Sequence, residues 1–296
     1  MRAIAVHGGA GKKSGREAKN QERLQALQAA LDRGRSVLDR GGRALEAAAE
    51  AVRVLEDSPL FNAGRGSVLN HEGKAEMDAA LMRGSDREAG AVAGVRTIKN
   101  PILLAARILE DSPHVFLIAE GAESWAREKG LETRAPEYFV TEERLLQLER
   151  ALAEGRTELD HTGLGTVGAV VLDDRGELAA AVSTGGLTNK APGRVGDSSL
   201  VGAGLYAEDG LCAIAATGRG EYFMRIAAAH RVAALMQYAG LSLERATEAV
   251  LNEVREMGGE GGFIALDAQG NIHMPFNSET MFRASLSPDG KVFLSG

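Results

Sequence analysis

Short apolar runs and helical repeats of apolar positions alternate along the whole chain. Residues 2–7 predict a buried strand that ends at HGGAG, and residues 17–58 carry two helical patterns that separate near Gly41 and Gly42. Residues 58–70, SPLFNAGRGSVLN, are rich in turn formers and indicate a loop. Further strands are predicted at 75–82, 89–95, 166–172, 177–184, 211–217, 262–267 and 291–294, and further helices at 101–111, 119–130, 142–154, 221–239 and 242–257.

The strands in this pattern fall into hairpins and the helices into pairs. That order is typical of a layered α+β fold and differs from the strict alternation of a parallel α/β sheet. The length of 296 residues is enough to bury a large core.

Composition and charge disfavour nucleic acids and membranes as partners. The formal net charge is −7, from 41 acidic and 34 basic residues, and no basic stripe indicates a nucleic-acid partner. No apolar run approaches the roughly 18 residues of a membrane span, so no membrane is expected. The first apolar run is too short for a secretory signal, and the single Cys212 is expected as a small buried hydrophobe. We therefore expect a cytoplasmic protein.

The hairpin predicted at 166–184 carries a threonine at its open end on each strand. A three-residue loop, Asp174 to Gly176, pairs Asp173 with Glu177, and counting outward places Thr166 opposite Thr184. Two hydroxyls are then expected to meet there. One interpretation is purely structural, because threonines favour strands and bond to each other.

The residues around this hairpin favour a catalytic role over a purely structural one. Gly165 gives the chain before Thr166 unusual backbone freedom. Residues 217–220, Thr-Gly-Arg-Gly, lie between a predicted strand and a predicted helix, where free backbone N–H groups can bind an oxyanion. Arg194 and Asp197 can grip the carboxylate and ammonium of one amino-acid head group. The alternative for this pair is a solvated surface ion pair.

A threonine hydroxyl needs a base before it is a nucleophile. His161 lies on a link between elements, and His230 lies within the Ala-rich helical pattern, so neither is well placed. The α-amine of an N-terminal threonine has a pKa of about 7.7–8.0, which suits a general base. Using it requires cleavage of the Gly165–Thr166 bond, which predicts fragments of residues 1–165 and 166–296.

Several motifs occur in a recognisable order: VHGGAG, PLFNAGRGSVLN, GTVGAVVLD, STGGLTNK, PGRVGDSS, GAGLYA, ATGRGE and PFNSETM. Together they resemble the plant-type asparaginase and isoaspartyl peptidase family of N-terminal-nucleophile hydrolases over essentially the whole chain. The resemblance implies a four-layer αββα sandwich, a single domain over residues 1–296 that cleaves itself into an α and a β subunit, and assembly as (αβ)2. It also implies small-molecule substrates, L-asparagine or β-aspartyl dipeptides.

The resemblance assigns roles residue by residue. Thr166 matches the nucleophile, Thr184 the supporting hydroxyl, Thr217 and Gly218 the oxyanion hole, and Asn62 the residue that borders it. The substrate-binding groups are Arg194 for the α-carboxylate, and Asp197 with the Gly220 carbonyl for the α-ammonium.

The family also implies a structural sodium ion and no organic cofactor. The ion would be held by backbone carbonyls of Leu55, Glu56, Ser58, Phe61, Ala63 and Arg65. The chain departs from the family pattern at Ser199, where Pro is frequent, and at Thr280, where Gly is common. Both positions bear on the shape of the substrate entrance.

Four alternatives stay open. A glycosylasparaginase-like enzyme is disfavoured by STGGLTNK and by the lack of a signal peptide. The glycine-rich HGGAG and TGRG match neither phosphate-binding pattern of nucleotide-binding proteins. A metal hydrolase is disfavoured because the histidines lack paired-ligand spacing: His7, His71, His114, His161, His230 and His273. A non-catalytic scaffold is disfavoured because every matched catalytic position is present.

Overall fold

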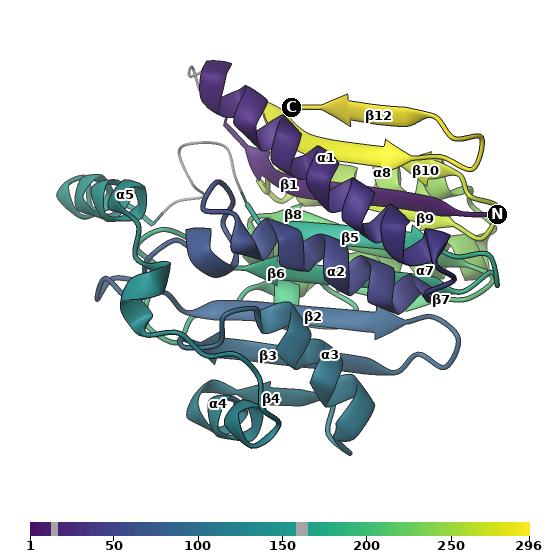
Figure 1. Ribbon diagram of the computed structural model, residues 1–296. Coiled ribbons are helices and arrows are strands. Elements are labelled where there is room, and N and C mark those ends of the chain that lie inside the picture. Colours follow the sequence, from purple (N-terminus) through teal and green to yellow (C-terminus); the bar gives the residue numbers. More distant parts are fainter. Residues whose placement is uncertain (13–16, 158–164) are drawn as a thin grey trace.

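The computed structural model describes residues 1–12, 17–157 and 165–296, and its centre is a pair of β-sheets (Figure 1). The larger sheet has eight strands in the order β12-β11-β1-β5-β6-β2-β3-β4. These strands are β1 (Ala3–Gly11), β2 (Met77–Arg83), β3 (Ala89–Val95), β4 (Phe116–Ile118), β5 (Val167–Leu172), β6 (Leu178–Thr184), β11 (Thr280–Leu286) and β12 (Val292–Ser295). The smaller sheet has the order β10-β9-β8-β7, with β7 (Leu205–Glu208), β8 (Cys212–Gly218), β9 (Gly261–Asp267) and β10 (Ile272–His273).

Helices cover the outer faces of both sheets. The large sheet is covered by α1 (Glu17–Asp39), α2 (Ala44–Asp57) and α3 (Pro101–Asp111), and its other face contacts the small sheet (Figure 1). The small sheet is covered by α7 (Ala228–Ala239) and α8 (Leu243–Glu256). Shorter elements are α4 (Ala119–Glu128), α5 (Glu142–Ala153), α6 (Gly220–Arg225) and the 3-10 turns η1 (Gly64–Gly66), η2 (Pro136–Phe139) and η3 (Asp197–Ser199). The fold is α+β, as the sequence predicted.

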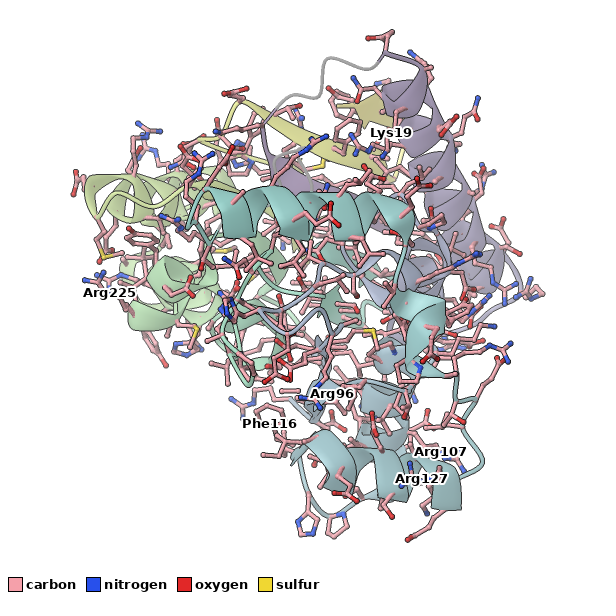
Figure 2. The ribbon with its side chains drawn as sticks, turned by 90° about the vertical axis from the view of Figure 1, so that its left-hand side faces the viewer. Lys19, Arg96, Arg107, Phe116, Arg127 and Arg225 are labelled. Carbon is pink, nitrogen blue, oxygen red and sulfur yellow. The ribbon has the colours of Figure 1, made fainter. Side chains whose placement is uncertain are left out.

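The β4 strand forms one edge of the large sheet. Phe116 and Arg127 lie at the end of the molecule formed by β4 and α4 (Figure 2). Phe116 and Ile118 are 37% and 62% exposed, so this edge presents apolar side chains outward. None of the helices in the described ranges is long and apolar enough to cross a membrane.

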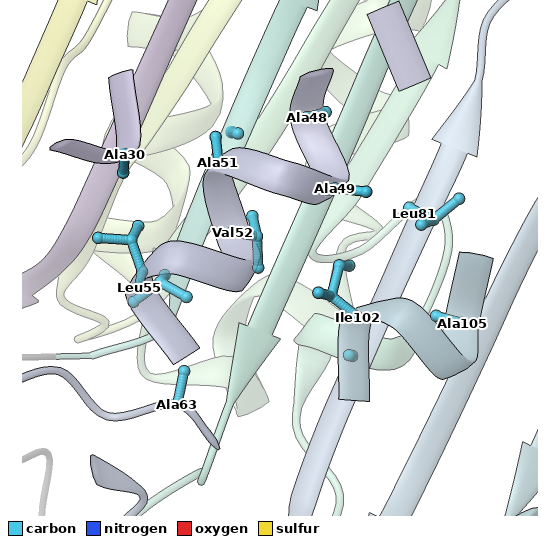
Figure 3. Close-up of a cluster of buried hydrophobic side chains, with 14 of the residues drawn as sticks. Ala30, Ala48, Ala49, Ala51, Val52, Leu55, Ala63, Leu81, Ile102 and Ala105 are labelled. Atoms are coloured by element: carbon cyan, nitrogen blue, oxygen red, sulfur yellow. The ribbon is translucent and has the colours of Figure 1, made fainter. Parts of the chain in front are cut away.

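Two apolar cores fill the spaces between layers. The outer core lies under α1–α3, where Ala48, Ala49 and Ala51 of α2 let that helix approach the sheet closely (Figure 3). Leu81 of β2 and Ile102 of α3 complete this part of the core. The inner core lies between the sheets and continues under α7 and α8, and it includes the buried Cys212. Burial of both sheet faces accounts for the nearly continuous apolar runs of the central strands.

The predicted central hairpin is confirmed in register. β5 and β6 pair from Val167 with Ser183 to Leu172 with Leu178. The Asp173 N–H donates to the Glu177 carbonyl at 3.1 Å, and Gly176 has φ +83°. The same register, extended by a single residue, sets Thr166 opposite Thr184 just beyond the last paired residues.

Two predicted boundaries were wrong. β1 runs through HGGAG to Gly11, because Gly9 with φ +107° forms a bulge after which pairing with β11 resumes. The helix predicted at 221–239 is two helices that separate at Ala227, which has φ +49°. The first amides of α7 donate to carbonyls of residues 202 and 203 instead of continuing the earlier helix.

Four strands were not predicted: β4, β7, β10 and β11. Three of them have two to four residues, too few for an alternating pattern to stand out. β11 has seven residues, and its Arg283 interrupts an otherwise apolar run.

Candidate active site

A small cavity at the open end of the β5–β6 hairpin brings together most of the predicted catalytic and substrate-binding residues. Its lining consists of Gly165, Thr166, Thr184, Gly186, Leu187, Arg194, Gly196, Asp197, Ser198, Gly218 and Gly220. The free space is about 10 Å³, which is room for about one water molecule. With Gly165 in place, the cavity is therefore too small for an amino acid.

The Thr166 side chain is 5% exposed at the end of this cavity. Its hydroxyl shares a hydrogen bond with the Ser198 hydroxyl at 3.0 Å. The Thr184 hydroxyl instead accepts from the Gly186 N–H at 3.0 Å. The predicted facing positions are thus consistent with the register, but the expected direct contact of the two hydroxyls is replaced by these bonds. Sequence reasoning missed Ser198, although it lies in the quoted GDSS segment.

The peptide before Thr166 is held by close backbone contacts. A Cβ atom on Gly9 would overlap the Gly165 nitrogen, and it would lie 2.9 Å from the Gly165 carbonyl oxygen. A Cβ on Gly165 would lie 2.7 Å from the Thr217 hydroxyl oxygen. Only glycine fits at both positions, which explains why the HGGAG motif and the Gly165–Thr166 step occur together.

Thr217 and Gly218 end β8 beside this peptide. Thr217 is fully buried, and its hydroxyl oxygen accepts the Ala10 N–H at 3.2 Å. Because that bond uses a lone pair, the Thr217 O–H proton stays available to a group in the site. Gly218 has φ +141°, and its nitrogen lies 3.7 Å from where a Gly165 Cβ would be.

Asn62 lies behind the cavity and does not line it. Its side-chain amide donates to the Gly186 carbonyl at 2.7 Å and its side-chain oxygen accepts the Val68 N–H at 3.0 Å. Its own carbonyl accepts the Gly185 N–H at 3.1 Å. Asn62 therefore fixes the loop that follows β6.

Arg194 is paired with a residue that the sequence did not single out. Its Nε and Nη2 donate to the Glu221 carboxylate at 3.0 and 2.8 Å. The alternative interpretation, a surface ion pair between Arg194 and Asp197, is not what the structure shows, because the ion-pair partner of Arg194 is Glu221 at the start of α6. The remaining Nη1 faces Gly186 and Gly196 at the cavity wall.

Asp197 is buried in the cavity wall at 3% exposure. Its Oδ2 lacks a hydrogen-bond partner in the part of the chain that the structure describes. Burial raises the pKa of Asp197 to about 7, although the Arg194 charge opposes the shift. The backbone of Gly220 lies against Asp197 Oδ1, 2.6 Å from where a Cβ would be. A buried carboxylate oxygen with free acceptor capacity suits a cationic group.

Two glycines pack closely against backbone carbonyls of the loop at residues 55–65. Gly64 lies directly against the Glu56 carbonyl, and Gly66 lies against the Phe61 carbonyl, so neither position has space for a side chain. Carbonyl oxygens are donors that hard cations accept, and two of the six implied ligands, the Leu55 and Ala63 carbonyls, already accept the Ser58 and Gly66 N–H groups. The six implied ligands all belong to this loop. In the three described ranges, no group of three His, Cys, Asp or Glu side chains is arranged to hold a metal ion.

The Glu56 side chain links this loop to β6. Its Oε1 accepts the Ser183 hydroxyl at 2.6 Å and the Ile102 N–H at 2.9 Å. Burial raises the pKa of Glu56 to about 8. The carboxyl group therefore holds its proton more strongly than an ordinary glutamate does, and it contacts Ser183, the residue before Thr184.

Two histidines that the structure describes, His7 and His230, are poorly suited to act as the base. His161 lies outside the described residues. His230 is on α7, with its ring 5.1 Å from that of Tyr206. His7 is fully buried in β1 opposite Gly168, and burial lowers its pKa to about 3. Ser199 and Thr280, the two departures, are both buried.

Comparison with known proteins gives a consistent result. The profile of a family described as Asparaginase matches residues 1–292. The chain is 50% identical over 293 residues to an isoaspartyl peptidase of Escherichia coli, covering 95% of this chain and 91% of that protein. It is 40% identical over 315 residues to a probable isoaspartyl peptidase/L-asparaginase 2 of Arabidopsis thaliana, with 97% and 96% covered. An isoaspartyl peptidase/L-asparaginase of Bos taurus is 42% identical over 292 residues, with 98% and 94% covered.

Proposed function

Because the chain belongs to the asparaginase family, we propose that it is an amidohydrolase that acts on L-asparagine, on β-aspartyl dipeptides, or on both. The bond cleaved is the side-chain amide of asparagine or the isopeptide bond of the dipeptide. The observation that carries the proposal is the cavity that joins Thr166 to Arg194 and to the partner-free oxygen of Asp197.

We propose that the chain first cleaves itself. The Thr166 hydroxyl attacks the Gly165 carbonyl carbon, and the resulting ester is hydrolysed to give a Gly165 carboxylate and a free Thr166 amine. The close contacts of Gly9 and Thr217 on Gly165 support this step because they restrict the peptide. Removal of Gly165 from the cavity lining would also enlarge a space that now holds about one water.

In the cleaved enzyme, the Thr166 α-amine takes the hydroxyl proton and the hydroxyl oxygen attacks the β-carbonyl of the substrate. The Thr217 hydroxyl and the Gly218 N–H stabilise the oxyanion. Ammonia or an amino acid leaves with a proton, and water then hydrolyses the β-aspartyl ester. Thr184 supports the nucleophile, Asn62 fixes the loop at its side, and Arg194, Asp197 and the Gly220 carbonyl hold the head group.

Further proposals concern the whole molecule. The helix, sheet, sheet and helix layers form the αββα sandwich of N-terminal-nucleophile hydrolases as a single domain. The two products remain together as αβ, and two copies assemble as (αβ)2. The exposed apolar edge at β4 supports self-association, because unpaired edges are prone to pair.

We also propose a structural sodium ion in the loop at residues 55–65 and a cytoplasmic location for the enzyme.

The decisive test is the intact mass of purified wild-type protein and of Thr166→Ala, followed by an assay of ammonia release. We expect two fragments, 1–165 and 166–296, in the wild type only, and loss of activity in the variant of about 10⁴-fold or more. The Ser242→Ala variant, which removes a hydroxyl that caps α8, is a matched control and should stay cleaved and active. A wild-type chain that is intact and fully active would contradict the self-cleavage.

A further inference from the structure

A buried layer of charged side chains lies directly behind the proposed head-group site. Its members are Asp78 on β2 and Lys190 in the loop after β6, which are 0% and 1% exposed. Neither belongs to the cavity lining. Burying two charges costs solvation energy, and apolar side chains of similar volume would fill the same space without that cost. Their presence so close to the cavity therefore calls for a role.

The sheet register aligns Asp78 with the reactive threonines. Asp78 pairs directly with Thr184 across β2 and β6, and Thr184 lies opposite Thr166 by the β5–β6 register. Directly opposed residues of neighbouring strands point to the same face. Asp78 is thus the third member of a row that starts at the proposed nucleophile.

Asp78 faces the segment that carries the head-group residues. Its Oδ1 accepts the Gly94 N–H at 2.9 Å, while its Oδ2 has no hydrogen-bond partner among the described residues. Burial raises the pKa of Asp78, and the charges of Lys190 and Arg194 and the backbone N–H of Gly196 oppose that shift. The carboxylate therefore acts on the segment between Arg194 and Asp197.

Lys190 reaches the same segment from its other end. Its Nζ donates to the Glu76 carbonyl at 2.8 Å and lies 3.0 Å from where a Gly186 Cβ would be. Gly186 in turn lines the cavity, with φ +84°, and a Cβ atom there would lie 3.2 Å from Arg194 Nη1. The lysine thus supports the wall that separates it from the Arg194 guanidinium.

From this arrangement we propose that Asp78 and Lys190 are positioning residues for the α-carboxylate and α-ammonium of the substrate. They act through Arg194 and Asp197 and touch no reacting atom. The Asp78 carboxylate attracts the Arg194 guanidinium from behind, and the Lys190 ammonium is the buried counter-charge of that carboxylate, so Arg194 keeps its place in the cavity wall. The inference rests on the proposed function and adds to it the groups that set head-group affinity.

The test uses three variants of the full chain: Asp78→Asn, Lys190→Met and the double variant. Each preparation is checked by intact mass, thermal unfolding, the kcat and KM for L-asparagine, and the inhibition constant of L-aspartate. The control is Asp86→Asn, which neutralises a surface carboxylate paired with Arg83 on the same β2–β3 hairpin.

We expect each single variant to unfold at a lower temperature, because it leaves an uncompensated buried charge. The double variant should recover most of that loss. All three should bind L-aspartate at least about tenfold more weakly, with kcat changed by less than about threefold. Stability that recovers while affinity does not is the signature of positioning, because a merely structural pair would recover both.

Other outcomes count against the inference. Wild-type affinity in any folded single variant, recovery of affinity in the double variant, or failure of all three variants to fold would each overturn it. Inactivity of the wild type and of Asp86→Asn on asparagine and on β-aspartyl dipeptides would instead overturn the proposed function. The two failures are therefore distinguishable.

Discussion

The two ends of the cavity are held in place by different kinds of interaction. At the Thr166 end the contacts are between backbone atoms and hydroxyls: Gly9 on Gly165, Gly165 on Thr217, and Thr166 on Ser198. At the Arg194 end the side chains are charged: Arg194 pairs with Glu221, and the buried Asp197, Asp78 and Lys190 lie near them. Steric fit therefore determines the geometry at the Thr166 end, and electrostatic interactions determine it at the Arg194 end.

This difference separates two kinds of failure. A backbone atom that gains a methyl neighbour must move, and a shift near 1 Å at reacting atoms can cost about 100-fold in rate. A lost charge leaves the backbone where it is and weakens the hold on a charged ligand. Changes at the Thr166 end should therefore act on cleavage and kcat, and changes at the Arg194 end on KM.

The largest expected effect is at Gly9. Gly9→Ala places a methyl group on the Gly165 nitrogen and strains a residue with φ +107°, so we expect self-cleavage to slow by about 100-fold or more. Mass spectrometry of samples incubated after purification measures the rate. Gly41→Ala is the control, because Gly41 has φ +79° with open space around it. Equal cleavage rates in the two variants would refute the steric account.

A smaller effect is expected from Arg194→Lys. Lysine keeps the charge but loses the planar fork that fits a carboxylate and also bonds Glu221. We expect KM for L-asparagine to rise about 10- to 100-fold with cleavage unchanged and kcat altered only a few-fold. Arg225→Lys, a change of an exposed residue at the end of α6 (Figure 2), should leave both constants unchanged. A fall in kcat with KM unchanged would contradict the assignment of the Arg194 end to substrate binding.

The smallest effect concerns pH. Asp197 has a pKa of about 7, so it is increasingly protonated below that pH and loses its attraction for an ammonium group. The inhibition constant of L-aspartate should rise by about tenfold for each pH unit below 7. Stability should run the other way: a raised folded-state pKa means that the contribution of Asp197 to the free energy of unfolding falls as pH rises from about 4 to about 7.

Asp197→Asn separates these two trends. The variant should bind L-aspartate weakly at every pH, and urea unfolding at pH 5 and pH 8 should show less loss of stability with rising pH than in the wild type. An inhibition constant that follows the wild-type pH profile in this variant would assign the titration to another group.

Sequence patterns predicted the elements whose structure depends on local residues alone. The β5–β6 hairpin has apolar strands and a glycine with φ +83° in its loop, so counting from the loop gave the register directly. The β1 strand was predicted to end at HGGAG, whereas it continues through a bulge at Gly9, which packs against Gly165. The break at Ala227 depends on carbonyls from residues 202 and 203, which no local pattern contains.

The site shows the same limit. Thr166, Thr184, Gly218, Arg194, Asp197 and Gly220 were found because glycine-rich motifs frame them, and they line one cavity. Glu221 and Ser198 were missed because their importance comes from a partner 27 or 32 residues away. Asp78 and Lys190 were missed too. Their signal was present, since an acid inside an apolar strand pattern is unusual and demands a buried counter-charge.

The strand order of the large sheet has a consequence for the separated pieces. Residues 166–296 supply β12, β11, β5 and β6, while residues 1–165 supply β1 and the β2, β3 and β4 block. The two sets interleave, with β1 between β11 and β5, and β6 beside β2. A chain cut at Gly165 would keep three ladders between its halves, so dilution could not part them. Denaturation would be needed first, and the halves would then have to find each other as separate molecules.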